Sequence, residues 1–132
     1  MNFAKISTIP RTGSFCSLIS SDELLTIQTN RVSIISAING FCKYFYLLPQ
    51  VPRLFAINTQ SASRFAVVYK SSGNLPESVA LLETETGKVI KQFALKSTSQ
   101  KFLHIALGSH LFFVTDSVPG TIYLTQPTGT QI

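Results

Sequence analysis

The chain has 132 residues, of which 45% are hydrophobic and only 13% are charged, and its net charge is +5. This composition excludes a disordered chain, because disordered sequences carry too little apolar surface to offset the entropy of ordering. The length allows one ordinary domain, or one minimal sandwich with a long extension. Ten Phe, four Tyr and many β-branched residues favour strands over helices, so we expect an all-β protein.

The high apolar content, combined with so few charges, favours a protein that buries part of its surface against partners. The basic residues are spread along the chain, apart from a group on and beside one predicted hairpin: Lys88, Lys91, Lys96 and Lys101. We interpret this group as a solvated face, because nucleic-acid binders concentrate their charge in a patch with interleaved aromatic residues. Nucleic acid is therefore not the expected partner.

The two cysteines, Cys16 and Cys42, match no metal-binding spacing, and we expect both to be free, buried thiols. The first residues lack the apolar core and cleavage site of a secretory signal. The longest apolar stretch, Val32 to Leu48, is interrupted by polar residues and is shorter than the ~20 residues that cross a bilayer. We therefore expect no membrane span.

Residues 1–63 are irregular, with prolines and glycines that interrupt short apolar runs. A strand is expected at Leu24–Thr29, although the polar residues before it could instead cap a single helical turn. Asn39-Gly40 separates two β-rich runs and predicts a hairpin, because both central residues of a type I′ turn need positive φ. The proline-rich segment Leu48–Pro52 is expected to be an edge or a linker. This half is predicted to be a docking extension that contains a hairpin.

Residues 64–132 are more regular, and their alternating apolar pattern predicts short strands. Six strands are expected: Arg64–Lys70, Glu77–Glu83, Val89–Lys96, Lys101–Leu107, His110–Asp116 and Thr121–Gln126. Turn signals separate them, including Gly87 and Pro119-Gly120, and this spacing is typical of an antiparallel sandwich.

The alternation also predicts which side chains form the core of this sandwich. The expected core residues are Val79, Leu81, Val89, Phe93, Leu103, Ile105, Leu111 and Phe113. The carboxylates of Glu77, Glu83 and Glu85 bracket one strand and its turn, where we expect them to be exposed to solvent.

The same region resembles the transthyretin-like and carboxypeptidase-regulatory-like β-sandwich modules, over about residues 64–126. The residues that carry the resemblance are Pro76, Val79, Leu81, Glu83, Thr86, Gly87, Val89, Ile90, Phe102, Leu107, Phe112, Phe113, Val114 and Asp116. The chain has Ser97–Gln100 where the family usually has an Asp-Gly pair. The resemblance implies a small immunoglobulin-like or transthyretin-like antiparallel sandwich, of a kind found in virion proteins of tailed bacteriophages.

No motif in the sequence carries chemistry. His104 and His110 have no Cys, Asp or Glu at ligand spacing, and we expect structural roles for both. The chain has no phosphate-binding glycine loop and no nucleophile elbow. We therefore expect a protein that is not an enzyme, with no catalytic residue, cofactor, metal or small-molecule substrate.

Three function classes remain open. The first is a structural protein of a tailed-bacteriophage virion, in the tail, at the head–tail junction or as capsid decoration. It would be located in the virion after assembly in the host cytoplasm, with other virion proteins and copies of itself as partners. The second is a cell-surface or secreted adhesion module, and the third is a basic nucleic-acid-binding β protein.

The contact surface is expected in residues 1–63, because a few isolated strands are only marginally stable in water and gain from pairing with a neighbour's sheet. Aromatic residues dominate interface energetics, which makes one run the best candidate. The candidates are Phe41, Tyr44, Phe45, Tyr46 and Leu48. The alternative is that Phe45 packs on the protein's own core.

Overall fold

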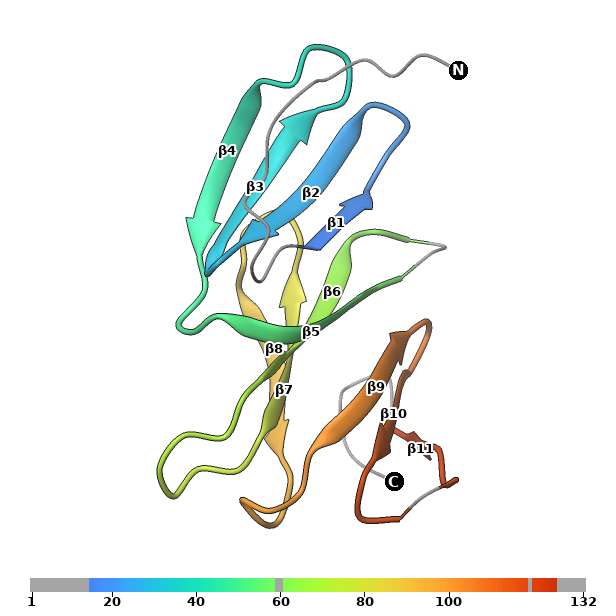
Figure 1. Ribbon diagram of the computed structural model, residues 1–132. Coiled ribbons are helices and arrows are strands. Elements are labelled where there is room, and N and C mark those ends of the chain that lie inside the picture. The colour runs from blue at the N-terminus through green and yellow to red at the C-terminus, as the bar shows by residue number, and fades with distance from the viewer. Residues whose placement is uncertain (1–14, 59–60, 119, 126–132) are drawn as a thin grey trace, which may run out of the picture. The chain divides into compact units, whose positions relative to one another are not determined.

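The computed structural model describes residues 15–58, 61–118 and 120–125 (Figure 1). This part of the chain forms antiparallel β-sheets and contains no helix, which confirms the expected all-β class. It accordingly has no helix long and apolar enough to cross a membrane. The chain divides into two compact units, Met1–Val51 and Pro52–Ile132.

The first unit contains one four-stranded sheet in the order β1-β2-β3-β4, in which each strand pairs with the next along the chain. Its strands are β1 (Phe15–Leu18), β2 (Glu23–Gln28), β3 (Arg31–Ser36) and β4 (Cys42–Leu47). Strand β2 confirms the strand expected after the acidic residues, and β3 with β4 confirms the expected hairpin.

The turn of this hairpin differs from the predicted type I′ turn. Only Gly40 has positive φ (76°), whereas Asn39 does not. The Ser36 N–H donates to the Phe41 carbonyl oxygen (2.9 Å), and the Gly40 N–H donates to the Ser36 carbonyl oxygen (2.8 Å). The Asn39 side chain accepts a hydrogen bond from the Phe41 N–H (3.0 Å). The loop is therefore longer than a type I′ turn and needs a single left-handed residue.

The second unit begins with a four-stranded sheet in the order β5-β6-β7-β8. Its strands are β5 (Pro52–Ile57), β6 (Arg64–Tyr69), β7 (Ser78–Glu83) and β8 (Val89–Ala94). A three-stranded sheet in the order β11-β10-β9 follows it. Its strands are β9 (Phe102–Leu107), β10 (Leu111–Thr115) and β11 (Tyr123–Leu124). All six strands expected after residue 63 are present; Pro119 and Gln126 lie outside the described residues.

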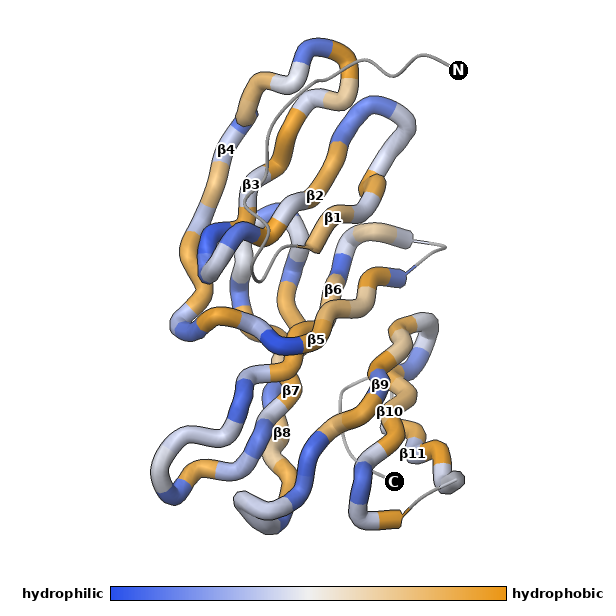
Figure 2. The backbone as a smooth tube through the Cα atoms, in the orientation of Figure 1, coloured by the Kyte–Doolittle hydropathy of each residue, from blue (hydrophilic) through white to orange (hydrophobic). Residues whose placement is uncertain are grey.

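The two sheets of the second unit share one hydrophobic core. Ala66, Val68, Val79 and Leu81 come from the first sheet, and Phe102, Leu111 and Phe113 come from the second. Apolar residues, orange in Figure 2, recur along β7 and β10, which contribute to this core.

The structure divides the chain earlier than the predicted boundary between residues 63 and 64. That boundary falls in the connection between β5 and β6, which pair along their length from Pro52 to Ile57. Pro52 begins an edge strand, a position where the missing N–H of proline is tolerated. The segment before it, residues 48–51, links β4 to β5, in line with the expected linker.

The two four-stranded sheets repeat one local design in their last hairpins. The Glu83 N–H donates to the Lys88 carbonyl oxygen (2.9 Å), and the Gly87 N–H donates to the Glu83 carbonyl oxygen (2.8 Å). Gly87 has a φ of 75°, which matches Gly40 in the β3–β4 loop. Each hairpin also has a β-bulge at the same place, after Ile34 in β3 and after Leu81 in β7. Strands β4 and β8 are therefore equivalent outer strands of the two sheets.

Four of the eight predicted core residues are buried: Val79, Leu81, Leu111 and Phe113. Phe93 and Ile105 are half-buried and pack against the same core. The prediction is wrong for Val89 and Leu103, which are 46% and 44% exposed.

Both errors occur at β-bulges, where an extra residue changes which side chain faces inward. Val89 pairs with Leu82 and Lys91 pairs with Leu81, so Ile90 is the extra residue in β8. Ile90, rather than Val89, packs on the core. A bulge in β9 likewise skips Leu103, and Phe102 is fully buried there.

Two predictions of solvent exposure are also wrong. Glu77 was expected to be exposed, but its side chain is only 1% exposed. Its carboxylate accepts hydrogen bonds from Arg53 Nε (2.8 Å), Arg53 Nη2 (2.6 Å) and the Phe102 N–H (2.8 Å), which satisfies the charge. Conversely, Cys16 and Cys42 are free, as expected, but lie on outward-facing positions and are exposed rather than buried.

Candidate functional site

Strand β4 carries most of the residues predicted to form a contact surface. Phe41, Tyr44 and Phe45 are exposed, while Tyr46 is half-buried. Burial raises the pKa of the Tyr46 hydroxyl above its ordinary range. The prediction is wrong for Leu48, which is 3% exposed and belongs to the core.

Sequence reasoning missed Leu47, which is 65% exposed. Strand alternation could have found it, because Phe45 and Leu47 share one face of β4 and Tyr44 and Tyr46 share the other. We use the name "β4 patch" for the exposed set on both faces of β4 and in the loop before it: Phe41, Tyr44, Phe45 and Leu47.

Strand β4 lies at an edge of its sheet, so one side of its main chain has no partner strand among the described residues of that sheet. The Leu48 N–H donates to the Asn30 carbonyl oxygen (2.7 Å), which directs the main chain of Leu48 toward β3. Antiparallel pairing alternates these directions, so the N–H and C=O groups of Phe45 and Leu47 point toward the open edge.

Two polar contacts shape the β4 patch. The guanidinium of Arg31 lies over the ring of Phe45, with its central carbon 3.9 Å from the ring centre. Lys43 forms a 2.9 Å ion pair with Glu23, and this hydrogen bond raises the pKa of Lys43. The charge of Lys43, the one lysine in β4, is therefore paired with Glu23 in β2 of the same sheet.

The equivalent strand β8 has a different surface. Where β4 has Tyr44 and Phe45, β8 has Lys91 and Gln92. The two sheets thus share hairpin geometry but differ in the chemistry of their outer strands.

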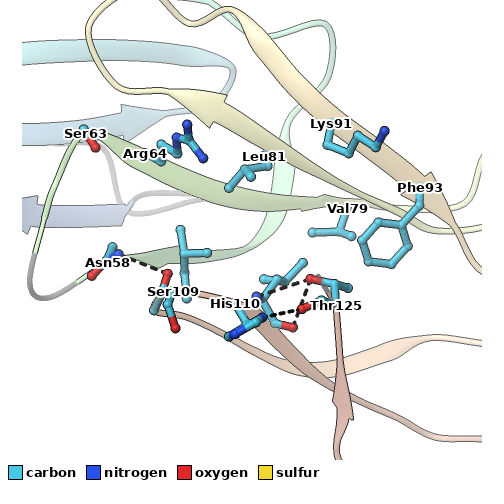
Figure 3. Close-up of a pocket in the computed structure, with 13 residues that line it drawn as sticks. Asn58, Ser63, Arg64, Val79, Leu81, Lys91, Phe93, Ser109, His110 and Thr125 are labelled. Carbon is cyan, nitrogen blue, oxygen red and sulfur yellow. Dashed lines mark hydrogen bonds between the residues drawn. The ribbon is translucent and has the colours of Figure 1, made fainter. Parts of the chain in front are cut away.

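A pocket of about 210 Å³ lies within the second unit, between the β5–β8 sheet and the β9–β11 sheet. Figure 3 shows Arg64 and Lys91 on one side of this pocket and His110 and Thr125 on the other. Apolar side chains, including that of Phe93, line its inner wall.

Hydrogen bonds to the main chain fix the polar wall of the pocket. His110 Nδ1 lies 2.8 Å from the Thr125 carbonyl oxygen. A carbonyl oxygen only accepts, so Nδ1 carries the proton and Nε2 is left for another partner. The Asn58 amide donates to the Gly108 carbonyl oxygen (3.0 Å). The bond between His110 and Thr125 supports the structural role expected of His110. His104 is exposed on β9.

Among the described residues, no cluster of three or more His, Cys, Asp or Glu could hold a metal ion. Asp116, one of the residues that carry the resemblance, accepts a hydrogen bond from the Lys101 N–H (2.9 Å) and closes the β9–β10 sheet at that end.

No protein-family model matches this chain, and no curated protein matches it in sequence. Solved structures do match its fold. The WD40 domain of Neurospora crassa Pan2 matches with a TM-score of 0.57 and 14% identity, over 86% of this chain and 33% of that chain. Saccharomyces cerevisiae Sqt1 matches with a TM-score of 0.60 and 15% identity, over 85% of this chain and 29% of that chain. Kuenenia stuttgartiensis hydrazine synthase matches with a TM-score of 0.58 and 10% identity, over 80% of this chain and 36% of that chain.

This chain spans about a third of the length of each of these chains. At such low identity the likeness shows the fold alone. The immunoglobulin-like or transthyretin-like type of sandwich and the virion role stay predictions that these comparisons do not support. What the likeness shows is that successive antiparallel sheets follow one another along the chain as they do in part of the Pan2 WD40 domain.

Proposed function

We propose that this protein is a non-enzymatic structural module that associates with a second copy of itself through the outer edge of β4. One observation carries the proposal: β4 exposes aromatic and apolar side chains at positions where the equivalent strand β8 has Lys91 and Gln92. An exposed apolar edge strand is a template for pairing with another chain.

The usual protections of an edge strand are weak here. Natural proteins place lysine or proline on exposed edges to prevent pairing. Strand β4 has no proline, and its lysine, Lys43, is paired with Glu23. The open N–H and C=O groups of Phe45 and Leu47 supply the main-chain hydrogen bonds that a second strand needs.

The sequence of β4 is compatible with its own copy. In antiparallel pairing centred on Phe45, Phe45 meets Phe45 of the copy, Tyr44 meets Tyr46, and Lys43 meets Leu47. No charged residue meets its own kind, and like charges directly opposite one another are the arrangement that destabilises such pairs. The central aromatic pair favours this register, and the two-fold axis closes the assembly as a dimer.

The test is the molar mass of the protein by size-exclusion chromatography with light scattering, over a range of concentrations. We expect a dimer of the wild-type chain, and a monomer of the Leu47→Lys variant. Leu75→Lys is the matched control, because Leu75 is 67% exposed in the second unit and Leu47 is 65% exposed in the first. A wild-type monomer at high concentration, or equal effects of the two substitutions, contradicts the proposal.

Such self-association is compatible with a structural role in a virion, which the sequence resemblance implies. An assembly assay in a suspected host particle tests that setting separately, by asking whether the Leu47→Lys chain is incorporated as well as the Leu75→Lys chain.

A further inference from the structure

We propose that the pocket between the β5–β8 and β9–β11 sheets binds a small organic carboxylate with a short apolar tail. The proposal is independent of self-association, because every residue that lines this pocket belongs to the second unit. A molecule bound there is held and not transformed, so the expectation of no small-molecule substrate is unaffected.

Two cations line the pocket at different places along one wall (Figure 3). Arg64 lies opposite Glu83 in the β6–β7 register, and Lys91 lies opposite Leu81 in the β7–β8 register. Neither Arg64 nor Lys91 forms an ion pair with a described residue. Both side chains line the pocket and no described acidic residue does, so a bound anion would lie in a positive field.

Glu83 is the acidic group closest to these cations in the strand register, and it is engaged elsewhere. Its Oε1 atom accepts a hydrogen bond from the Thr86 hydroxyl (2.8 Å), which directs the carboxylate toward the hairpin loop. Glu83 forms no ion pair with Arg64, so the guanidinium donors of Arg64 are available to a ligand. Charge-assisted hydrogen bonds to a carboxylate are about twice as strong as neutral ones.

The opposite wall supplies a neutral donor or acceptor at a fixed place. The Thr125 carbonyl oxygen holds Nδ1 of His110, so the ring is oriented and Nε2 is left for a ligand. Ser109 beside it adds a hydroxyl group to the pocket lining. A preoriented wall lowers the entropy cost of binding a small molecule.

The pocket also has apolar side chains that suit a hydrocarbon tail. Val79, Leu81 and Phe93 line it from one sheet, and Leu107 and Leu111 line it from the other. The cavity is about 210 Å³, whereas an engineered apolar cavity of about 150 Å³ is enough to bind benzene. A carboxylate with a tail of about six carbon atoms therefore fits, and hexanoate is a suitable probe.

The experiment is a titration of the ¹⁵N-labelled protein with hexanoate, followed by two-dimensional amide NMR. We expect saturable shifts at four residues of the pocket lining: Arg64, Gly108, Ser109 and His110. Hexanamide has nearly the same shape without the charge, and we expect it to bind about tenfold more weakly. Equal affinity for the two molecules, or shifts that do not saturate or do not centre on this pocket, overturns the proposal.

Variants assign the effect to the two cations. Arg64→Gln and Lys91→Gln should each weaken hexanoate binding about tenfold while hexanamide binding stays the same. The matched controls are Lys70→Gln, just beyond the other end of β6, and Lys88→Gln, in the loop before β8. Thermal unfolding confirms that each variant is folded. Equal weakening by the controls shows non-specific attraction to a basic protein and also overturns the proposal.

A second probe distinguishes the source of the carboxylate. N-acetyl-leucine imitates the free C-terminus of a protein, whereas hexanoate imitates a free fatty acid. Tighter binding of the first identifies a protein terminus as the ligand, and tighter binding of the second identifies a small metabolite. Binding of neither overturns the proposal.

Discussion

The guanidinium of Arg53 lies against the carboxylate of Glu77, and both groups also bind the main chain of Phe102. The pair therefore joins β5, the residue before β7 and the start of β9, which belong to two different sheets. An ion pair in this position fixes where one sheet meets the other, because its charges can be satisfied in only one arrangement.

Replacing Arg53 with methionine should destabilise the protein by about 3 kcal/mol, because the buried carboxylate of Glu77 loses its counter-charge. This loss is at the lower end of the roughly 3–5 kcal/mol that breaking a buried ion pair costs, because a third of the Arg53 side chain is exposed. Urea unfolding measures the change in the free energy of unfolding. Glu85→Gln, at an exposed carboxylate, is the control and should change stability by less than about 0.5 kcal/mol. Equal effects would show that the ion pair does not hold the two sheets together.

The bulge in β9 predicts opposite results at neighbouring positions. Phe102→Ala should cost about 3–5 kcal/mol of stability, because Phe102 is fully buried and packs edge-to-face on Phe113. Leu103→Ala should cost less than about 1 kcal/mol, because Leu103 is exposed. Denaturant unfolding of the two variants compares them directly. The reverse order would mean that β9 has the register that simple alternation suggests.

The two equivalent loops predict a shared requirement for glycine. Gly40→Ala and Gly87→Ala should each destabilise the protein by about 1 kcal/mol, because a side chain disfavours the left-handed backbone at these positions. Gly108→Ala is the control: Gly108 has no positive φ, and an added Cβ would meet nothing within 4 Å. Thermal unfolding should show no loss for this control. A loss at Gly108 alone would contradict the assigned loop geometry.

Tyr69 predicts a loss of stability at alkaline pH. Burial raises the pKa of its hydroxyl to about 12, above the ordinary value of 10.0. The folded protein therefore keeps the proton where the unfolded chain releases it, so stability is complete below about pH 10 and decreases as pH rises toward 12. Absorbance titration of tyrosinate detects the shifted group, and denaturant unfolding at several pH values measures the loss.

The Tyr69→Phe variant separates this group from the other tyrosines. The Tyr69 hydroxyl is buried and has no hydrogen-bond partner among the described residues, so removing it should leave the stability at neutral pH unchanged or slightly higher. The alkaline loss should become smaller. A marked loss of stability at neutral pH would show that the hydroxyl has a partner that the structure does not reveal.

The sequence predicted the strands well because alternation is a local property of each run. It could not predict which strands share a sheet, since pairing depends on contacts between separate runs. The prolines led to the prediction that residues 1–63 are irregular and that Leu48–Pro52 is an edge or a linker. Pro52 does begin an edge strand, but the residues before it form a four-stranded sheet.

The errors in the core and in the contact surface have the same physical origin. At a bulge two residues face one partner, and nothing in the side chains of Val89 and Ile90, or of Phe102 and Leu103, reveals which one turns inward. The run from Phe41 to Leu48 was identified as aromatic and apolar, and alternation places Leu47 on the face of Phe45, but only the structure shows that Leu48 is buried.

The hairpins β3–β4 and β7–β8 give the outer half of the two sheets the same backbone geometry. Both close with the same two main-chain hydrogen bonds, the same left-handed glycine and the same bulge. The hairpin geometry therefore depends on these local features and not on the side chains that point outward. A scaffold of this kind can acquire a new surface by changing a few outward positions. Two products of that freedom are the pair Tyr44 and Phe45 in one outer strand and the pair Lys91 and Gln92 at the equivalent positions of the other.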